Sequence, residues 1–133
     1  MFGHDDKLHL TVNEITRIPS GTVVRMSSLI SENDIRIDGS VSGDILCEGK
    51  LVLGPKGAII GDVVCRNADV SGSITGNVTA GDIFTLTDSG VLRGNMRSAK
   101  LCVEKGATFE GECGIISADD FTEACRKFRE DHE

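Results

Sequence analysis

The chain has 133 residues with 21 acidic and 14 basic side chains, a formal net charge of −7, and neither Trp nor Tyr. An acidic chain without these aromatic stacking platforms is a poor nucleic-acid binder, so we expect no nucleic-acid partner. The length corresponds to one domain, no apolar stretch approaches the roughly 20 residues of a transmembrane helix, and no signal-peptide core follows Met1. These features predict a cytoplasmic protein built around one folded unit.

The N-terminal segment differs in composition from the central part of the chain. Residues 1–14 carry one basic residue, Lys7, against the acidic Asp5, Asp6 and Glu14. Almost all Val, Ile and Leu residues lie in 15–116, which is also nearly neutral. We therefore predict a flexible N-terminal tail over 1–14 and the folded core over 15–116.

A repeat organises residues 15–116. The pattern glycine, any residue, apolar, any residue, glycine, then Asp or Asn and an apolar residue occurs four times, with looser copies at Gly21 and Gly106. The clear copies begin at Gly39, Gly57, Gly72 and Gly90. In the first loose copy, Arg25 takes the place of the second glycine, and successive copies are 15 to 18 residues apart. Such a period predicts a repeat architecture in which each unit stacks on its neighbours.

Apolar and polar residues alternate within each copy, as in Ile35-Arg36-Ile37 and Phe84-Thr85-Leu86. A period of two indicates β-strands with one buried face. A second pattern places an inward residue every six positions, at Val23, Leu29, Ile35, Val41, Cys47, Leu53, Ile59 and Cys65. Three short strands per copy predict an all-β fold, a single parallel β-solenoid of about six coils stacked about 4.8 Å apart.

The five cysteines contain no CxxC pair, which favours reduced thiols in a reducing compartment. The six-residue spacing places Cys47 and Cys65 in one inward column with Ala80 and Ser98. We interpret these cysteines as small core residues rather than as redox or metal-binding groups.

Residues 117–133 have a helical pattern. Phe121, Ala124, Cys125 and Phe128 form one apolar stripe, and Ser117 with Asp120 resembles a capping box. We expect an amphipathic helix over about 118–129. The stripe is compatible with packing on the rod, with lying across its last coil as an end cap, or with binding a partner.

The sequence offers little for catalysis. Hexapeptide-repeat acyltransferases share the coil length but need histidine in or between coils, whereas His4, His9 and His132 all lie in the tails. No phosphate-binding glycine loop occurs, and a polar column after the repeat glycines is explained by turn hydrogen bonds. We predict no catalytic, cofactor or metal site, and no enzyme activity.

Several segments together resemble the bactofilin family. They are Asp34-Ile-Arg-Ile-Asp-Gly-Ser-Val-Ser-Gly-Asp-Ile45, Leu53-Gly-Pro-Lys-Gly-Ala-Ile-Ile-Gly-Asp62, Asn67-Ala-Asp-Val-Ser-Gly72 and Val103-Glu-Lys-Gly-Ala-Thr-Phe-Glu-Gly111. The resemblance implies a right-handed β-helix that polymerises without nucleotide into cytoskeletal filaments. It also implies a scaffold at the inner face of the cytoplasmic membrane for cell shape or cell-wall remodelling, with cell-wall enzymes or their membrane adaptors as partners.

The resemblance also bears on the two tails. Met1 and Phe2 resemble the short hydrophobic membrane tag of many bactofilins, although Asp5 and Asp6 occur after them instead of lysines. The helical C-terminal segment departs from the disordered tail of many relatives.

The ends of a solenoid expose unpaired strand edges and a slice of core, so they favour self-association. The residues that we predict at this polymerisation interface are Ile15, Ile18, Val23, Met26, Phe109, Cys113, Ile115 and Ile116. The alternative is a rod that does not polymerise and presents its outer face to partners.

Overall fold

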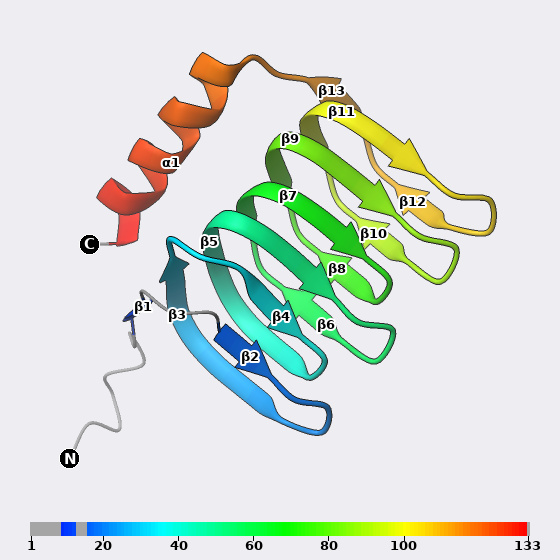
Figure 1. The fold of residues 1–133 in the computed structure, drawn as a ribbon, viewed down its shortest axis with the longest axis horizontal. Helices are drawn as coiled ribbons and strands as arrows, with labels where there is room; N and C mark the ends of the chain where they lie inside the picture. The colour runs from blue at the N-terminus through cyan, green and yellow to red at the C-terminus, as the bar shows by residue number, and fades with distance from the viewer. Residues whose placement is uncertain (1–8, 13–15, 133) are drawn as a thin grey trace.

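The structure is a computed structural model that describes residues 9–12 and 16–132. The chain winds into a β-solenoid of about six coils, followed by helix α1 (Ala118–His132) (Figure 1). The strands are β1 (His9–Val12), β2 (Thr16–Ile18), β3 (Val23–Ser31), β4 (Ile35–Ile37), β5 (Ser40–Leu53), β6 (Ala58–Ile60), β7 (Val63–Val70), β8 (Ser73–Thr75), β9 (Val78–Leu86), β10 (Val91–Arg93), β11 (Met96–Val103), β12 (Thr108–Glu110) and β13 (Cys113–Ile115). The solenoid that the repeat predicts is thereby confirmed.

The strands stack in parallel into three faces, and the long strands bend from one face to the next. Face 1 contains β2, β4 and residues 51–53, 68–70, 84–86 and 101–103. Face 2 contains residues 23–25 and 40–42, then β6, β8, β10 and β12. Face 3 contains β1, residues 28–31, 44–47, 63–65, 78–80 and 96–98, and β13.

Alternate residues of all three faces point into one continuous core. Ile37, Leu53, Ile74, Leu86 and Leu92 are fully buried in it. The alternation in the sequence therefore identified the buried face of the strands correctly. The inward column of cysteines is confirmed as well, because Cys47 is in register with Cys65, Cys65 with Ala80, and Ala80 with Ser98.

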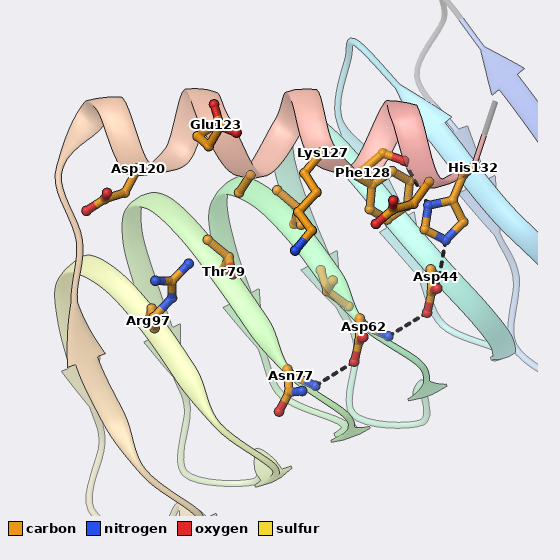
Figure 2. Close-up of a pocket in the computed structure, with 14 residues that line it drawn as sticks. Asp44, Asp62, Asn77, Thr79, Arg97, Asp120, Glu123, Lys127, Phe128 and His132 are labelled. Carbon is orange, nitrogen blue, oxygen red and sulfur yellow. Dashed lines mark hydrogen bonds and ion pairs between the residues drawn. The ribbon is translucent and has the colours of Figure 1, made fainter.

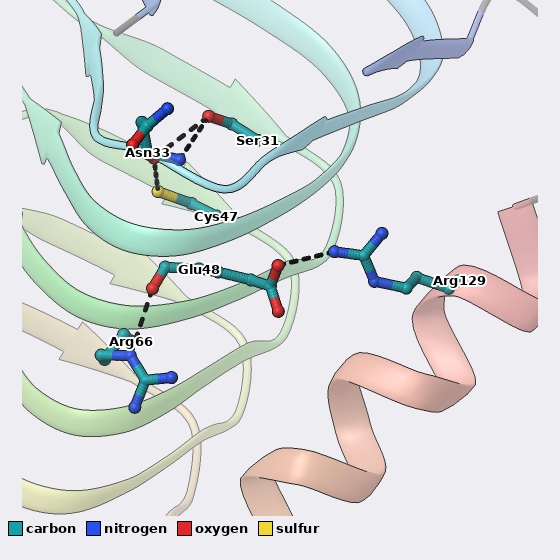
Figure 3. A network of polar contacts seen from close by, with 6 residues as sticks. All are labelled: Ser31, Asn33, Cys47, Glu48, Arg66 and Arg129. Atoms are coloured by element: carbon teal, nitrogen blue, oxygen red, sulfur yellow. Dashed lines mark hydrogen bonds and ion pairs between the residues drawn. The ribbon is translucent and has the colours of Figure 1, made fainter. Parts of the chain in front are cut away.

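The buried cysteines behave as packing residues. The Cys47 thiol donates a hydrogen bond to the Asn33 carbonyl at 3.2 Å (Figure 3), and burial raises the pKa of this thiol to about 11. Burial raises the pKa of Cys65 further still. Both groups stay protonated at neutral pH, which makes them poor nucleophiles and poor metal ligands.

The first coil differs from the sequence prediction by one residue. Val24, not Val23, is in register with the inward Val41 and packs against the core, whereas Val23 points outward and is 66% exposed. Arg25 pairs with Ser42 rather than standing in for the repeat glycine. The register shifts between Arg25 and Ser28, so this coil contains one residue more at this turn than the next coil does.

The repeat glycines form a column where face 2 turns into face 3. Gly43, Gly61, Gly76, Gly94 and Gly111 all have φ between 143° and 148°, a conformation that favours glycine. Each lies against the carbonyl of the coil before it, and a Cβ on Gly76 would be 2.0 Å from the Gly61 oxygen. Glycine is required here by the backbone conformation and by the close approach of successive coils.

Helix α1 lies along face 3, on the outside of the rod (Figure 1). Phe121, Cys125 and Phe128 are buried against an outward row formed by Ile30, Leu46 and Val64, so the apolar stripe packs on its own rod. A helical turn of about 5.4 Å nearly matches the coil spacing of about 4.8 Å, so successive turns meet successive coils. The helix therefore lies along the flank instead of crossing the last coil as an end cap.

Polar contacts fix the helix at both ends. Ser117 and Asp120 exchange hydrogen bonds in a capping box at its start. Further along, Arg66 lies 5.1 Å from the centre of the Phe121 ring, and Arg129 contacts Glu48 at 2.6 Å (Figure 3). The predicted end near residue 129 was three residues short, because His132 still bonds to Phe128 in the last turn.

His132 joins the end of the helix to β5. Its Nδ1 lies 2.8 Å from the Phe128 carbonyl oxygen and its Nε2 lies 2.8 Å from the Asp44 carboxylate (Figure 2). Burial lowers the pKa of His132, but the Phe128 carbonyl and Asp44 outweigh it, so the pKa is raised overall. Only the imidazolium donates from both ring nitrogens, as this geometry requires.

The predicted flexible tail over 1–14 is wrong for part of its length. Residues 9–12 form β1, which pairs in parallel with residues 28–31 of β3. The alternating sequence His9-Leu10-Thr11-Val12 suits a strand, and β3 offers a free edge for it. Met1 and Phe2 lie outside the described residues.

We predict that Gly76→Ala lowers the free energy of unfolding by about 3 kcal/mol or more, because it combines backbone strain with a clash against the neighbouring coil. Chemical denaturation monitored by circular dichroism measures the change. Gly114→Ala is the matched control, since its Cβ would lie 3.7 Å from Arg97 Cγ, an ordinary contact. Equal effects of the two substitutions would contradict the role of the glycine column.

We predict that the His132 contact stabilises the helix most below pH about 6.5 and is lost as pH rises through the raised pKa of the folded chain. The variant Asp44→Asn removes the carboxylate charge but keeps the side-chain oxygen that accepts from the Asp62 N–H. NMR titration of His132 should give a lower pKa in Asp44→Asn than in the wild type. Identical titration curves would show that Asp44 does not hold the ring.

Candidate functional site

The C-terminal end of the rod exposes a slice of its core. Leu101, Val103, Phe109, Cys113 and Ile115 occupy inward columns, in register with core residues of the preceding coil. Leu101 is 41% exposed, Val103 48% and Ile115 85%, whereas their inward neighbours Phe84 and Leu86 are fully buried. These side chains lack only the next coil to cover them.

The backbone is open at the same end. Residues 101–103, β12 and β13 each pair with the preceding coil on one edge, and within the described residues no strand pairs with the other edge. Three short edges thus present backbone donors and acceptors beside an apolar patch. An edge of this kind is a template for adding strands from another molecule.

The N-terminal end is more closed. Ile18 and Met26, which the sequence placed in the interface, are each only 7% exposed, and Ile15 lies outside the described residues. Val23 is exposed, and the outer edges of β2 and residues 23–25 have no partner strand in the described part of the chain. Val23 and these backbone edges are therefore the groups that the N-terminal end exposes for a contact with another subunit.

At the C-terminal end, one predicted interface residue does not lie at an open surface. Ile116 is 6% exposed because it belongs to the cluster beneath α1. The reason is that the chain turns back along the flank directly after β13, which covers Ile116 and leaves Ile115 free.

Sequence reasoning missed Leu101 and Val103. Their alternation with Cys102 was visible, but their exposure results from the absence of a later face 1 strand above them in the described structure. Because the polypeptide ends its winding on faces 2 and 3, the strand at 101–103 is the last one on face 1. Counting the strands on each face, rather than the copies of the repeat, would have identified these residues.

A groove of about 480 Å³ runs between α1 and the rod (Figure 2). Lys127 and Arg97 lie in it with several carboxylates, among them Asp62 and Asp120. Asp62 accepts from the Asn77 N–H and Asp120 from the Ser117 N–H, so these groups already serve the fold. Among the described residues, no three His, Cys, Asp or Glu side chains are placed to hold a metal ion.

The described residues contain no helix that is long and apolar enough to cross a membrane. The sequence had predicted none.

Comparison with known proteins agrees with this arrangement. The profile of the family described as "Bactofilin: Polymer-forming cytoskeletal" matches residues 16–114. Bactofilin BacP of Myxococcus xanthus (strain DK1622) is 34% identical over 95 residues, which cover 68% of this chain and 40% of BacP. Bactofilin BacO of the same organism is 26% identical over 108 residues, covering 77% of this chain and 86% of BacO. No solved structure matches the chain.

The family profile covers the solenoid almost from its first described coil to its last. The family consists of polymer-forming cytoskeletal proteins and not of enzymes, in agreement with the sequence, which offered no catalytic histidine within the coils. Self-association is thus the property that the open terminal coils have to explain. The chain belongs to the bactofilin family.

Proposed function

We propose that this chain polymerises end to end through its terminal coils, without nucleotide, and that the filaments form a scaffold at the inner face of the cytoplasmic membrane for cell shape or cell-wall remodelling. The exposed core slice at Leu101, Val103 and Ile115 is the observation that carries the proposal. An added subunit supplies there the coil that these side chains lack.

Two physical terms favour the end contact. Covering the exposed parts of Leu101, Val103 and Ile115 contributes roughly 1–2 kcal/mol for each side chain. Backbone hydrogen bonds across the joined edges add about 0.5–1.5 kcal/mol each. No group in the contact requires a nucleotide or a metal, so assembly depends on protein concentration alone.

The position of α1 supports a polymer rather than a capped rod. Its apolar stripe packs against face 3, and the helix leaves the inward columns of the last coil uncovered. The alternative of a rod that does not polymerise would require a cap at this end.

The membrane part of the proposal rests on Met1 and Phe2. Burying two such side chains gives about 3–6 kcal/mol before ordering costs, so one chain binds a bilayer weakly. Asp5 and Asp6 oppose an anionic surface. A filament that presents many tags gains avidity, and membrane binding therefore depends on polymerisation. Cell-wall enzymes or their membrane adaptors are the proposed binding partners of this scaffold.

We predict that Ile115→Arg and Val103→Arg each abolish filaments, because a cation would be buried without a partner at the subunit contact. A cost of about 3 kcal/mol raises the concentration needed for assembly on the order of 100-fold. Ultracentrifugation and negative-stain microscopy in nucleotide-free buffer with EDTA measure assembly, and circular dichroism checks the fold.

Thr85→Arg is the matched control for these variants, since Thr85 points outward on face 1, in the strand before the terminal strand at 101–103. It should leave filaments unchanged. Normal polymerisation of both end-coil variants would exclude the C-terminal end as a subunit contact.

We predict that assembled full-length chain floats with liposomes and that removal of residues 1–3 abolishes flotation without affecting filaments. The Ile115→Arg variant, which keeps the tag but does not assemble, should float poorly because avidity is lost. Equal flotation with and without residues 1–3 would remove the membrane tag from the proposal.

A further inference from the structure

We propose that a notch on the corner between faces 1 and 2 is a docking site for a short acidic peptide segment of a partner protein. This notch, which we call the proline notch, has a volume of about 480 Å³ and is lined by Arg17, Pro19, Ser20, Asp38, Pro55 and Lys56. The inference rests on the proposed scaffold role, because it assigns the surface on which a scaffold subunit would hold a client. The notch is separate from the terminal coils and from α1.

The notch results from the different lengths of the turns that lead from face 1 to face 2. Four residues form the turn in the first, third, fifth and sixth coils, at 19–22, 54–57, 87–90 and 104–107, whereas two residues form it in the second and fourth, at 38–39 and 71–72. With coils about 4.8 Å apart, the long turns of the first and third coils lie about 9.6 Å from each other, on either side of a short turn. A gap of this width accommodates one extended peptide.

The short turn of the fourth coil lies between two long turns as well, but its neighbour covers it. The Ser89 hydroxyl donates to the Ser71 carbonyl at 2.9 Å, and the Thr87 hydroxyl lies 2.9 Å from the Ser71 hydroxyl. The walls of the proline notch instead contain Pro19 and Pro55, whose rings carry no hydroxyl and whose nitrogens cannot donate a hydrogen bond. The notch over the second coil therefore stays open.

Two cations stand at the edge of the proline notch. Arg17 points outward on face 1, in register with Arg36, and Lys56 lies in the long turn of the third coil; both are exposed. Within the described part of the chain, neither forms an ion pair with a carboxylate. Asp38, the one carboxylate among the lining residues, is already held by Arg36 through hydrogen bonds of 2.9 and 3.0 Å. The notch is thus positively charged on a chain whose net charge is −7.

These features together define the chemistry of the ligand. A carboxylate of the ligand can bind Arg17 through two parallel hydrogen bonds, and a second carboxylate can bind Lys56 as a point charge. The pyrrolidine rings of Pro19 and Pro55 offer apolar walls for a side chain between the two carboxylates. Because proline rings are rigid, binding orders little of the protein, which favours affinity. The notch therefore fits an extended peptide in which acidic residues flank an apolar one.

An anionic membrane surface fits this corner less well than a peptide does. The long turns of the fifth and sixth coils carry the exposed Asp88 and Glu104 on the same corner. A bilayer with anionic lipids that lay along the corner would be repelled by both. A peptide in the proline notch avoids these carboxylates, because it contacts only the first three coils.

The notch stays accessible in a filament. It lies on the side of the rod away from α1 (Figure 1), and it is not part of the last coil. Charges at an exposed edge are partly screened by salt, so one notch binds a peptide weakly. Every subunit of a filament presents the same notch, so a partner that carries several acidic segments gains avidity.

The test uses a fluorescein-labelled pentapeptide of sequence Gly-Glu-Leu-Glu-Gly and the full-length chain. Fluorescence anisotropy measures binding at about 0.15 M ionic strength, and circular dichroism checks the fold of each variant. We expect Arg17→Glu and Lys56→Glu each to weaken binding at least about tenfold, because each removes an attraction and adds a repulsion. A peptide with glutamine in place of both glutamates should bind the wild type at least about tenfold more weakly.

Lys105→Glu is the matched control, since it makes the same charge change in the long turn of the sixth coil. It lies three coils, or about 14 Å, along the rod from Lys56, which exceeds the screening length of about 8 Å. This variant should bind the peptide like the wild type. Equal weakening in Lys105→Glu would show a general charge effect and overturn the site.

The remaining outcomes separate the ligand classes. Equal binding of the two peptides, or unchanged binding in Arg17→Glu and Lys56→Glu, would overturn the docking site. Inorganic phosphate that binds as tightly as the peptide would replace it by a simple anion site. Phosphatidylglycerol vesicles that retain a chain without residues 1–3, and lose it in Arg17→Glu, would assign the notch to lipid and overturn the peptide.

The same samples distinguish this inference from the proposed filaments. Ultracentrifugation of the full-length chain reports assembly independently of peptide binding. Filaments that do not bind the peptide would overturn the docking site alone. Peptide binding by a chain that never assembles would support the site and overturn end-to-end polymerisation.

Discussion

Each coil of this protein is completed by the coil beside it. Successive coils share parallel backbone hydrogen bonds on all three faces, and the glycine column allows them to approach closely where face 2 turns into face 3. A single coil has neither a core nor paired edges, so its stability comes from its neighbours. The last coil has a neighbour on one side only. The contact that builds the rod therefore also creates the surface on which another subunit can add.

Helix α1 is consistent with this constraint because it stabilises the rod without closing it. It runs along face 3 against Ile30, Leu46 and Val64, and its turns nearly match the spacing of the coils. Arg129 and His132 tie its end to β5. Since the helix packs on the flank and does not cover the last coil, the apolar residues of that coil remain available for assembly.

The three faces consequently differ in what they can contact. Face 3 is covered by the helix, whereas faces 1 and 2 are uncovered and each carries an ion pair, Lys50 with Asp69 on face 1 and Arg93 with Glu110 on face 2.

The sequence by itself determined the solenoid, its core and its ends in outline. Alternation in segments such as Phe84-Thr85-Leu86 fixes which side chains face inward, and the glycine spacing fixes the coil length, because both are local consequences of strand geometry. The stripe at Phe121, Cys125 and Phe128 likewise fixed that the C-terminal segment is an amphipathic helix.

Only the tertiary structure decided where the helix lies, which residue begins the register of the first coil, and which end residues are exposed. The consecutive pairs Leu29-Ile30, Ile45-Leu46 and Val63-Val64 carried a signal that face 3 is covered on both sides, and alternation alone did not reveal it. Ile115 and Ile116 are adjacent in sequence, yet one is exposed and the other buried. Their difference depends on how a distant part of the chain packs beside them, and a local pattern contains no information about that.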